Sequence, residues 1–476
     1  MRLLRVRYTD TPEETDVLII GGGPGGYVAA IRAGQLGFDV TLIEKEAYGG
    51  TCLNTGCIPS KALIHASDVV HDAETAREMG IEGDLSVDME SMVDWKDDIV
   101  DRMTGSVEKL CKANQVTLVD GVARFVDEHR ARIETDDGDG EVDFEYAVVA
   151  TGSRPIEVPG FSFESDRVLS SRDALALDSV PDSLVVVGAG YIGLELATTY
   201  AKLGADVTVV EMLDDVLPAF ETDLSRPVKR RAESMGVEFN FGEAASEWRE
   251  TTGGIEVLTR TESGEESVYP ADNVLVAVGR QPVTDTVDLE ATGLELTDDG
   301  FMETDERART SLDHVFAVGD VAGEPMLAHK ASAEGIVAAE VIAGADASLR
   351  DRAIPAAVFT DPEIGTVGLS EAEAVDEGFD PVVGEFPFRA SGRALTMGET
   401  DGFVRLVADE STGIVLGGQV VGPEASELIA EIGTAVAART TLEALGGTIH
   451  SHPTLSEAVM EAAENALGHA VHTLNR

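Results

Sequence analysis

The residues best suited to chemistry in this sequence are two cysteines five positions apart. Cys52 and Cys57 lie in the segment Gly49-Gly-Thr-Cys52-Leu-Asn-Thr-Gly-Cys57-Ile-Pro-Ser-Lys61, and Cys111 is the third cysteine of the chain. A zinc site would need two further ligands, and neither Cys111 nor a histidine run with ligand spacing supplies them. Inert core thiols would not usually lie in so Gly/Thr/Pro-rich a stretch. With zinc binding and inert packing kept as alternatives, we favour a redox-active disulfide.

Such a disulfide needs an electron carrier and a proton acceptor. Disulfide exchange proceeds by thiolate attack, so one sulfur must meet the substrate and the other must meet the carrier. A flavin is the natural carrier, because it can accept electrons from a thiolate and pass a hydride to NAD. Near the carboxyl end, His450-Ser-His452-Pro-Thr-Leu-Ser-Glu457 offers a histidine that titrates near neutrality and a carboxylate that can fix its ring.

Two glycine-rich turns predict the elements that position this chemistry. An apolar strand at 16–20 leads into Gly21-Gly-Gly-Pro-Gly-Gly26, a helical stretch at 27–36 and a second strand at 39–44 that ends in Glu44. A strand, a glycine turn, a helix and an acid at this distance together indicate a dinucleotide site. Gly23 would let the backbone approach a pyrophosphate, whose charge lies at the helix N-terminus.

The same pattern returns in the middle of the chain. A strand at 183–187 precedes Gly188-Ala-Gly-Tyr-Ile-Gly193, a helix to Leu203 and a strand at 206–211 that ends in Glu211. In both units the acid lies 23 residues after the first glycine. Here Gly190 would face the pyrophosphate, and Glu211 favours NAD because a carboxylate would repel the 2′-phosphate of NADP. Two dinucleotide sites beside a redox disulfide indicate an electron relay.

These motifs together resemble the dihydrolipoamide dehydrogenase family of flavin-dependent pyridine nucleotide–disulfide oxidoreductases. The resemblance rests on the cysteine segment, both glycine turns, Ala150-Thr-Gly152, Ala317-Val-Gly-Asp320 and the segment from His452 to Glu457, and it runs from about Asp16 to about Glu461. It implies oxidation of a protein-bound dihydrolipoyl group, with FAD and NAD as cofactors. Glutathione-type and mercuric reductases are the alternatives. The former use NADP, and the latter would carry an extra cysteine pair near the carboxyl end.

The resemblance also implies roles for individual residues. Cys52 is similar to the interchange thiol that meets the lipoyl disulfide, and Cys57 to the thiol beside the flavin ring. Lys61 and Glu195 resemble the ion pair under the flavin N5. His452 matches the base of the family and Glu457 its orienting acid, whereas we expect His450 and Cys111 to be structural.

Further positions match cofactor contacts of the family. For FAD these are Gly21, Gly23, Gly26, Glu44, Lys61, Gly121, Thr151, Gly152, Ser153, Asp320, Met326, Leu327, Ala328 and His329, with the last four at the start of a helix whose amino end faces the flavin. For NAD they are Gly188, Gly190, Tyr191, Ile192, Gly193, Glu195, Glu211 and Gly279, with Tyr191 as an aromatic gate.

The fold expected is α/β, with two Rossmann-like dinucleotide-binding domains and a C-terminal α+β dimerisation domain. We predict an FAD-binding domain at 1–155, an NAD-binding domain at 156–280, a central segment at 281–350 that completes the FAD site, and an interface domain at 351–476. A homodimer follows from the family.

Composition excludes several other functions. The 35 Lys and Arg against 88 Asp and Glu give a net charge of −53, which would repel nucleic acid. Lysine is scarce, with eight residues against 27 arginines, and this acid excess is typical of proteins that work in molar salt, where charges are screened within about 3 Å. The sequence has neither an apolar run long enough for a membrane helix nor a secretory signal, so we expect a cytoplasmic protein that binds no membrane.

Overall fold

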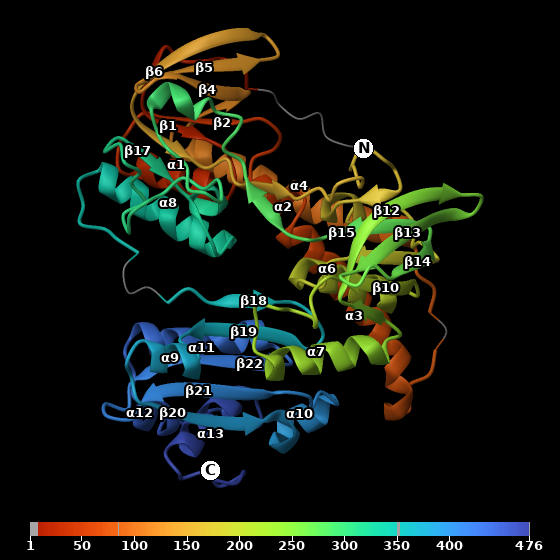
Figure 1. Cartoon of the computed structure of the whole chain (residues 1–476). Coiled ribbons are helices and arrows are strands. Elements are labelled where there is room, and N and C mark those ends of the chain that lie inside the picture. The colour runs from red at the N-terminus through yellow and green to blue at the C-terminus, as the bar shows by residue number, and fades with distance from the viewer. Residues whose placement is uncertain (1–7, 84, 350–352, 476) are drawn as a thin grey trace.

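Three sheet-based domains make up the structure, a computed structural model that describes residues 8–83, 85–349 and 353–475. Figure 1 shows the first sheet at one end of the molecule, the C-terminal domain at the other, and the second domain, with β10 (Asp206–Glu211) and α6 (Tyr191–Lys202), beside them. The first domain is built on a seven-stranded sheet with the order β3-β2-β1-β6-β5-β4, to which β17 is added on β6. Its strands are β1 (Glu14–Ile20), β2 (Val40–Glu44), β3 (Thr117–Asp120), β4 (Val122–Asp127), β5 (Arg130–Thr135), β6 (Gly138–Val149) and β17 (Val315–Ala317).

Strand β17 brings a distant part of the chain back to the first sheet. Its residues pair in parallel with Ala147–Val149 of β6, more than 160 positions earlier. Helix α8 (Ala328–Ile342) follows and packs against α1 (Pro24–Gln35). The two helices approach each other so closely that an added Cβ on Gly335 would lie 2.4 Å from the carbonyl oxygen of Gly25. The chain after residue 280 therefore contributes to the domain that its beginning forms.

Helix α8 begins two residues later than the sequence predicted. The helix was expected to start at Met326, but Leu327 has extended backbone angles and is the N-cap, so Ala328 is the first helical residue. The first helical hydrogen bond runs from the amide of Ala331 to the carbonyl of Leu327, whose own amide donates to Pro325. The turn at Pro325 holds Met326 and Leu327 outside the helix.

The second domain repeats the strand, turn and helix arrangement. Its parallel sheet has the order β11-β10-β9-β15-β8, and a three-stranded antiparallel sheet, β12-β13-β14, packs beside it. The strands are β8 (Val168–Leu169), β9 (Ser183–Val187), β10 (Asp206–Glu211), β11 (Glu238–Phe241), β12 (Glu243–Thr251), β13 (Gly254–Thr261), β14 (Glu266–Ala271) and β15 (Asn273–Val276). The helices are α5 (Ser171–Ala174), α6 (Tyr191–Lys202) and α7 (Thr222–Ser234).

The C-terminal domain is an antiparallel sheet covered by helices. The strand order is β18-β19-β22-β21-β20. Its strands are β18 (Ala356–Val358), β19 (Glu363–Gly368), β20 (Pro381–Pro387), β21 (Phe403–Asp409) and β22 (Val415–Gly422). Helices α11 (Ala425–Ala437) and α13 (Glu457–Ala466) pack on this sheet and share one apolar core with it.

Two arginines fasten the second domain to the C-terminal domain, and each lies among three carboxylates. Arg231 of α7 is 3.4 Å from Asp361, 2.8 Å from Glu399 and 3.8 Å from Asp401. Arg405 of β21 contacts Glu221 and Asp223 at the start of α7, and Glu385 of β20. At this boundary the many acids are therefore grouped around a few arginines.

No helix among the described residues is long and apolar enough to cross a membrane.

Candidate active site

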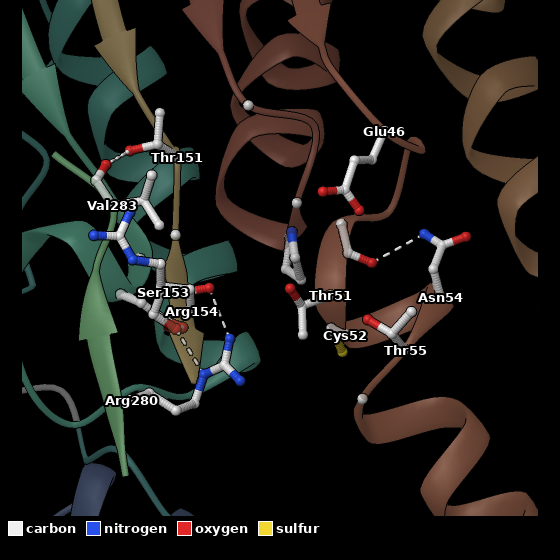
Figure 2. Close-up of a pocket in the computed structure, with 18 of the residues that line it drawn as sticks. Glu46, Thr51, Cys52, Asn54, Thr55, Thr151, Ser153, Arg154, Arg280 and Val283 are labelled. Atoms are coloured by element: carbon white, nitrogen blue, oxygen red, sulfur yellow. Dashed lines mark hydrogen bonds between the residues drawn. The ribbon is translucent and has the colours of Figure 1, made fainter. Parts of the chain in front are cut away.

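A cavity of about 960 Å³ lies between the first and second domains. This volume is at the upper end of the range of about 300–1,000 Å³ that is usual for small-molecule sites. Figure 2 shows Glu46, Thr51, Cys52, Asn54 and Thr55 on one wall, and Thr151, Ser153, Arg154, Arg280 and Val283 on the other. Segments from both domains thus meet around one extended ligand site.

The first and third glycines of both turns are required by packing. Gly21 and Gly188 both have φ of +106°, and an added Cβ would lie 2.3 Å from the carbonyl oxygen of Ala150 and 2.5 Å from that of Ala277, respectively. A Cβ on Gly26 or Gly193 would lie 1.8 or 2.1 Å from the carbonyl oxygen of the first glycine. Any larger residue would push the helix away from the strand.

The second glycine of each turn leaves space for a ligand instead. A Cβ on Gly23 would meet nothing nearer than 4.0 Å, and one on Gly190 would meet nothing within 4 Å. Both are N-cap residues, of α1 and of α6, where unpaired backbone amides favour an anion. The two turns therefore fit the pyrophosphates of two dinucleotides, and the cavity beside Gly23 fits FAD.

The acids at the ends of β2 and β10 are bonded to the turns. Glu44 accepts hydrogen bonds from the amides of Gly22 at 2.7 Å and Glu46 at 2.6 Å. Glu211 accepts from the amides of Ala189 at 2.7 Å and Leu213 at 2.9 Å. A carboxylate has about four acceptor positions, so each can still bind ribose hydroxyls. Burial raises the pKa of Glu44, and these amides oppose that rise.

The cysteine pair lies where two helices meet at the cavity. Cys52 belongs to α2 (Gly50–Asn54), and Cys57 is the first residue of α3 (Cys57–Thr75). Both are free thiols that line the cavity. Hydrogen bonding from Cys52 and then the charge of Lys61 lower the pKa of the Cys57 thiol to about 7, against the effect of burial. The hydrogen bond between the two thiols and burial raise the pKa of Cys52, so Cys57 loses its proton first.

Lys61 and Glu195 form an ion pair that joins α3 to α6 beside these thiols. The Nζ–Oε2 distance is 2.8 Å, and the Glu195 side chain is only 5% exposed. The other carboxylate oxygen accepts a hydrogen bond from the amide of Phe359 at 2.9 Å, and the Lys61 ammonium lies 4.4 Å from the centre of the Phe359 ring. One acid thus contacts both the first domain and the start of the C-terminal domain.

Asp320 is held on the opposite wall through Ser153. The Ser153 hydroxyl donates to Asp320 at 2.5 Å and accepts from Nε of Arg280 at 2.8 Å. Arg280 also donates to the Ser153 carbonyl at 2.7 Å, across the short antiparallel pair of β7 (Ser153–Pro155) and β16 (Arg280–Pro282). Figure 2 shows Arg280 reaching Ser153.

The predicted histidine base lies outside this cavity. His452 and Glu457 are bonded to each other, with Nδ1 of the histidine 2.9 Å from the carboxylate, and the His452 side chain is 79% exposed. Neither His452 nor Glu457 is among the described residues that line the cavity. The His450 side chain is buried, with one ring nitrogen 2.7 Å from Glu431 and the other 2.9 Å from the Thr448 carbonyl. Cys111 is also buried, in α4 (Met89–Ala113).

The cavity gathers many of the residues predicted from the sequence, but not all of them. Those that line it are Gly21, Gly23, Glu44, Cys52, Cys57, Lys61, Gly121, Thr151, Gly152, Ser153, Tyr191, Ile192, Glu195, Asp320, Met326 and Ala328. Those that do not are Gly26, Leu327, His329, Gly188, Gly190, Gly193, Glu211, Gly279, His452 and Glu457. Gly26, Gly188 and Gly193 act through packing, and the ring of His329 lies 2.6 Å from the Pro355 carbonyl.

Several cavity residues were missed by the sequence reasoning. Arg280 follows the predicted Gly279 directly, so its place after the strand that ends at Val276 was a usable signal. Arg172 of α5 and Glu46 form an exposed ion pair of 3.0 Å, and both line the cavity. No local pattern announces that pair, because its members are 126 positions apart.

Comparison with known proteins decides the family. A family model described as pyridine nucleotide-disulphide oxidoreductase matches residues 15–335, and a model of the dimerisation domain of that family matches residues 354–463. The chain belongs to the pyridine nucleotide-disulphide oxidoreductases.

Relatives within this family are similar over nearly the whole chain. A dihydrolipoyl dehydrogenase of Halobacterium salinarum is 63% identical and one of Geobacillus stearothermophilus is 48% identical; the matches cover 98% and 97% of this chain, and 99% and 98% of the relatives. The crystal structure of LpdA from Mycobacterium tuberculosis has a TM-score of 0.89 at 30% identity, over 94% of this chain and 99% of that one.

These findings confirm the predicted family, the fold class and the two cofactors. This pyridine nucleotide-disulphide oxidoreductase is a flavoprotein that uses FAD and NAD. Its relatives include proteins of halophilic archaea, as the charge predicted. The dimerisation domain supports a homodimer. The glutathione-type and mercuric alternatives are not favoured.

Proposed function

We propose that this oxidoreductase is a dihydrolipoyl dehydrogenase, which oxidises a protein-bound dihydrolipoyl group and reduces NAD⁺. The observation that carries the proposal is the placement of Cys52 and Cys57 beside the Lys61–Glu195 pair, in a cavity bounded by the Gly23 turn. A dithiol substrate and a cysteine pair exchange electrons without any other reagent. The high similarity to relatives named dihydrolipoyl dehydrogenase supports the same substrate.

In the first half of the reaction the cysteines take two electrons from the substrate. One thiolate of the dihydrolipoyl group attacks Cys52 in the Cys52–Cys57 disulfide, and Cys57 leaves as a thiolate. The second substrate thiolate then attacks the substrate sulfur of this mixed disulfide, which releases oxidised lipoyl and the Cys52 thiolate. The lowered pKa of Cys57 makes it the better leaving group, because a more stable thiolate leaves faster.

The two protons of the dithiol need acceptors. We assign the first acceptance to His452, whose ring Glu457 orients by the 2.9 Å hydrogen bond. Because His452 does not line the cavity of its own chain, we propose that the His452 of a second copy completes the site across the dimer. The base and the thiols would then belong to different chains.

The reduced cysteine pair must be reoxidised. FAD, when bound, supplies a two-electron carrier between a thiolate and the nicotinamide. Around it, Lys61 provides a positive charge and Cys57 a thiolate within the same cavity. The overall balance is two electrons and one proton delivered to NAD⁺, and one proton released.

Assay of the purified protein with dihydrolipoamide and NAD⁺ in about 2 M KCl tests the proposal. We expect NADH formation that depends on dihydrolipoamide. Cys57→Ser should abolish it while FAD stays bound, whereas Cys111→Ser, the matched control at a buried thiol that does not line the cavity, should keep it. A Cys57→Ser variant with near wild-type turnover would contradict the relay, and a wild-type holoenzyme that ignores dihydrolipoamide would contradict the substrate.

A further inference from the structure

A buried ion pair on α8 has no part in the chemistry described above. Lys330 and Glu334 are one helical turn apart, with 2.9 Å between Nζ and Oε1, and their side chains are 9% and 8% exposed. Burying two charges costs free energy that their mutual attraction often fails to recover. A buried pair of this kind therefore calls for a reason other than stability.

The pair holds both ends of the short loop that carries Asp320. The second oxygen of Glu334 accepts a hydrogen bond from the amide of Gly319 at 2.6 Å, immediately before Asp320. Lys330 donates to the carbonyl of Gly323 at 3.0 Å, at the far end of the 3₁₀ turn Gly319–Ala322.

In its middle the loop is anchored by Val321, which is fully buried and whose carbonyl accepts a hydrogen bond from the amide of Met302 at 2.9 Å, but its two ends are glycines. Gly319 and Gly323 have φ of +80° and +130°, in the region where glycine is free to move and other residues are not. Asp320 gains one further contact from its own side chain, the hydrogen bond from Ser153. Without the ties to α8, these glycines would allow the backbone on either side of Val321 to shift, and Asp320 would move with it.

We propose that Lys330 and Glu334 are positioning residues for the flavin site, which act by clamping the Asp320 loop to α8. Asp320, Gly319 and the start of α8 all line the cavity, so the clamp fixes an acid and a helix N-terminus relative to each other. The charges serve this geometry because charge-assisted hydrogen bonds to backbone groups are stronger and more directional than neutral ones. The proposal rests on the proposed role of Asp320 in holding FAD.

Three variants separate positioning from packing. The double variant Lys330→Met and Glu334→Leu keeps most of the apolar volume but removes both ties, and such replacement of a buried ion pair is often neutral for stability. Glu334→Gln keeps an acceptor for the Gly319 amide. Glu340→Gln is the control on the same helix, since Glu340 pairs with Arg32 at 2.6 Å and does not touch the loop.

FAD release from the holoenzyme, followed by flavin fluorescence, and the flavin midpoint potential at saturating FAD are the measurements. We expect the double variant to release FAD at least about 10-fold faster with a shifted potential, from the loss of hydrogen bonds to charged groups. Glu334→Gln should stay within about 3-fold of wild type, and Glu340→Gln should change neither quantity.

The outcomes distinguish this proposal from its foundation. If the double variant matches the wild type in release rate and potential, or if Glu340→Gln produces the same changes, the clamp is overturned. Asp320→Asn measured alongside tests the foundation. If this variant also keeps FAD and potential unchanged, the role of Asp320 fails as well.

Discussion

Exchange of Lys61 for methionine should shift the ionisation of the reduced cysteine pair. The positive charge of Lys61 lowers the pKa of Cys57, while the negative charge of Glu195 raises it. Lys61→Met should therefore raise the pKa of Cys57, and Glu195→Gln should lower it. These opposite signs make the pair of variants its own control, because a general disturbance of the cavity would move both in the same direction.

The size of the effect follows from the position of Lys61. With a pKa of about 7, about half of Cys57 is thiolate at pH 7. An opposite charge nearby shifts a pKa by about 1 to 3, and the low end applies because the Lys61 side chain is 31% exposed. The thiolate fraction at pH 7 should then fall to roughly a tenth in Lys61→Met.

The assay is a pH titration of the two-electron-reduced holoenzyme. Thiolate formation is read from ultraviolet absorbance, and its position beside the flavin from long-wavelength charge-transfer absorbance. Lys229→Met is the matched control. Lys229 also forms a partly exposed ion pair, with Asp215, but it lies on α7 and does not line the cavity. Unchanged midpoints in both Lys61→Met and Glu195→Gln would refute the electrostatic reasoning.

Three further predictions follow from other contacts. Glu211→Arg should lower the ratio of kcat/KM for NAD over NADP by about 10-fold or more, because a cation would replace the acid at the predicted ribose position; Glu211→Gln should have a smaller effect. His452→Gln should reduce kcat by about 10²-fold or more with dihydrolipoamide, and Glu457→Gln by less, because it only orients the ring; equal losses would contradict this division of roles. Arg405→Met removes the cation that three carboxylates share, so the free energy of unfolding in urea should fall by about 2 kcal/mol at 0.5 M KCl. The loss should be smaller at 3 M KCl, where the repulsion between the carboxylates is screened. A loss independent of salt would show that packing, not charge, is responsible.

Local features of the fold could be predicted from the sequence because they depend on short-range patterns. Both glycine turns have the expected strand before them and helix after them, and the first glycine of each turn has the same φ of +106°. The spacing to Glu44 and Glu211 is equal because both acids end the next strand of the same unit. A repeated pattern of this kind can be recognised in a single sequence.

Contacts between distant segments left no such trace. The hydrogen bonds from Ser153 to Asp320 and from Arg280 to Ser153 depend on how β17 and β16 return to earlier strands. The pairing of Lys61 with Glu195 was expected from the family resemblance alone, since 134 positions separate the two residues. The exposed His452 shows the same limit, because the neighbours that we propose for it belong to a second copy of the chain.

The arrangement of Arg231 and Arg405 has a consequence for how such a chain can evolve. Each arginine contacts three carboxylates, so the loss of any single acid leaves two others in place. Loss of the arginine removes the attraction that three carboxylates share, although Asp361 keeps its ion pair with Lys202 at 2.7 Å. Mutational tolerance at this boundary should therefore be asymmetric: acidic positions are free to drift between lineages, whereas the two basic positions are held by selection, and a lineage moving to fresh water would shed acids one by one without first having to rebuild the boundary.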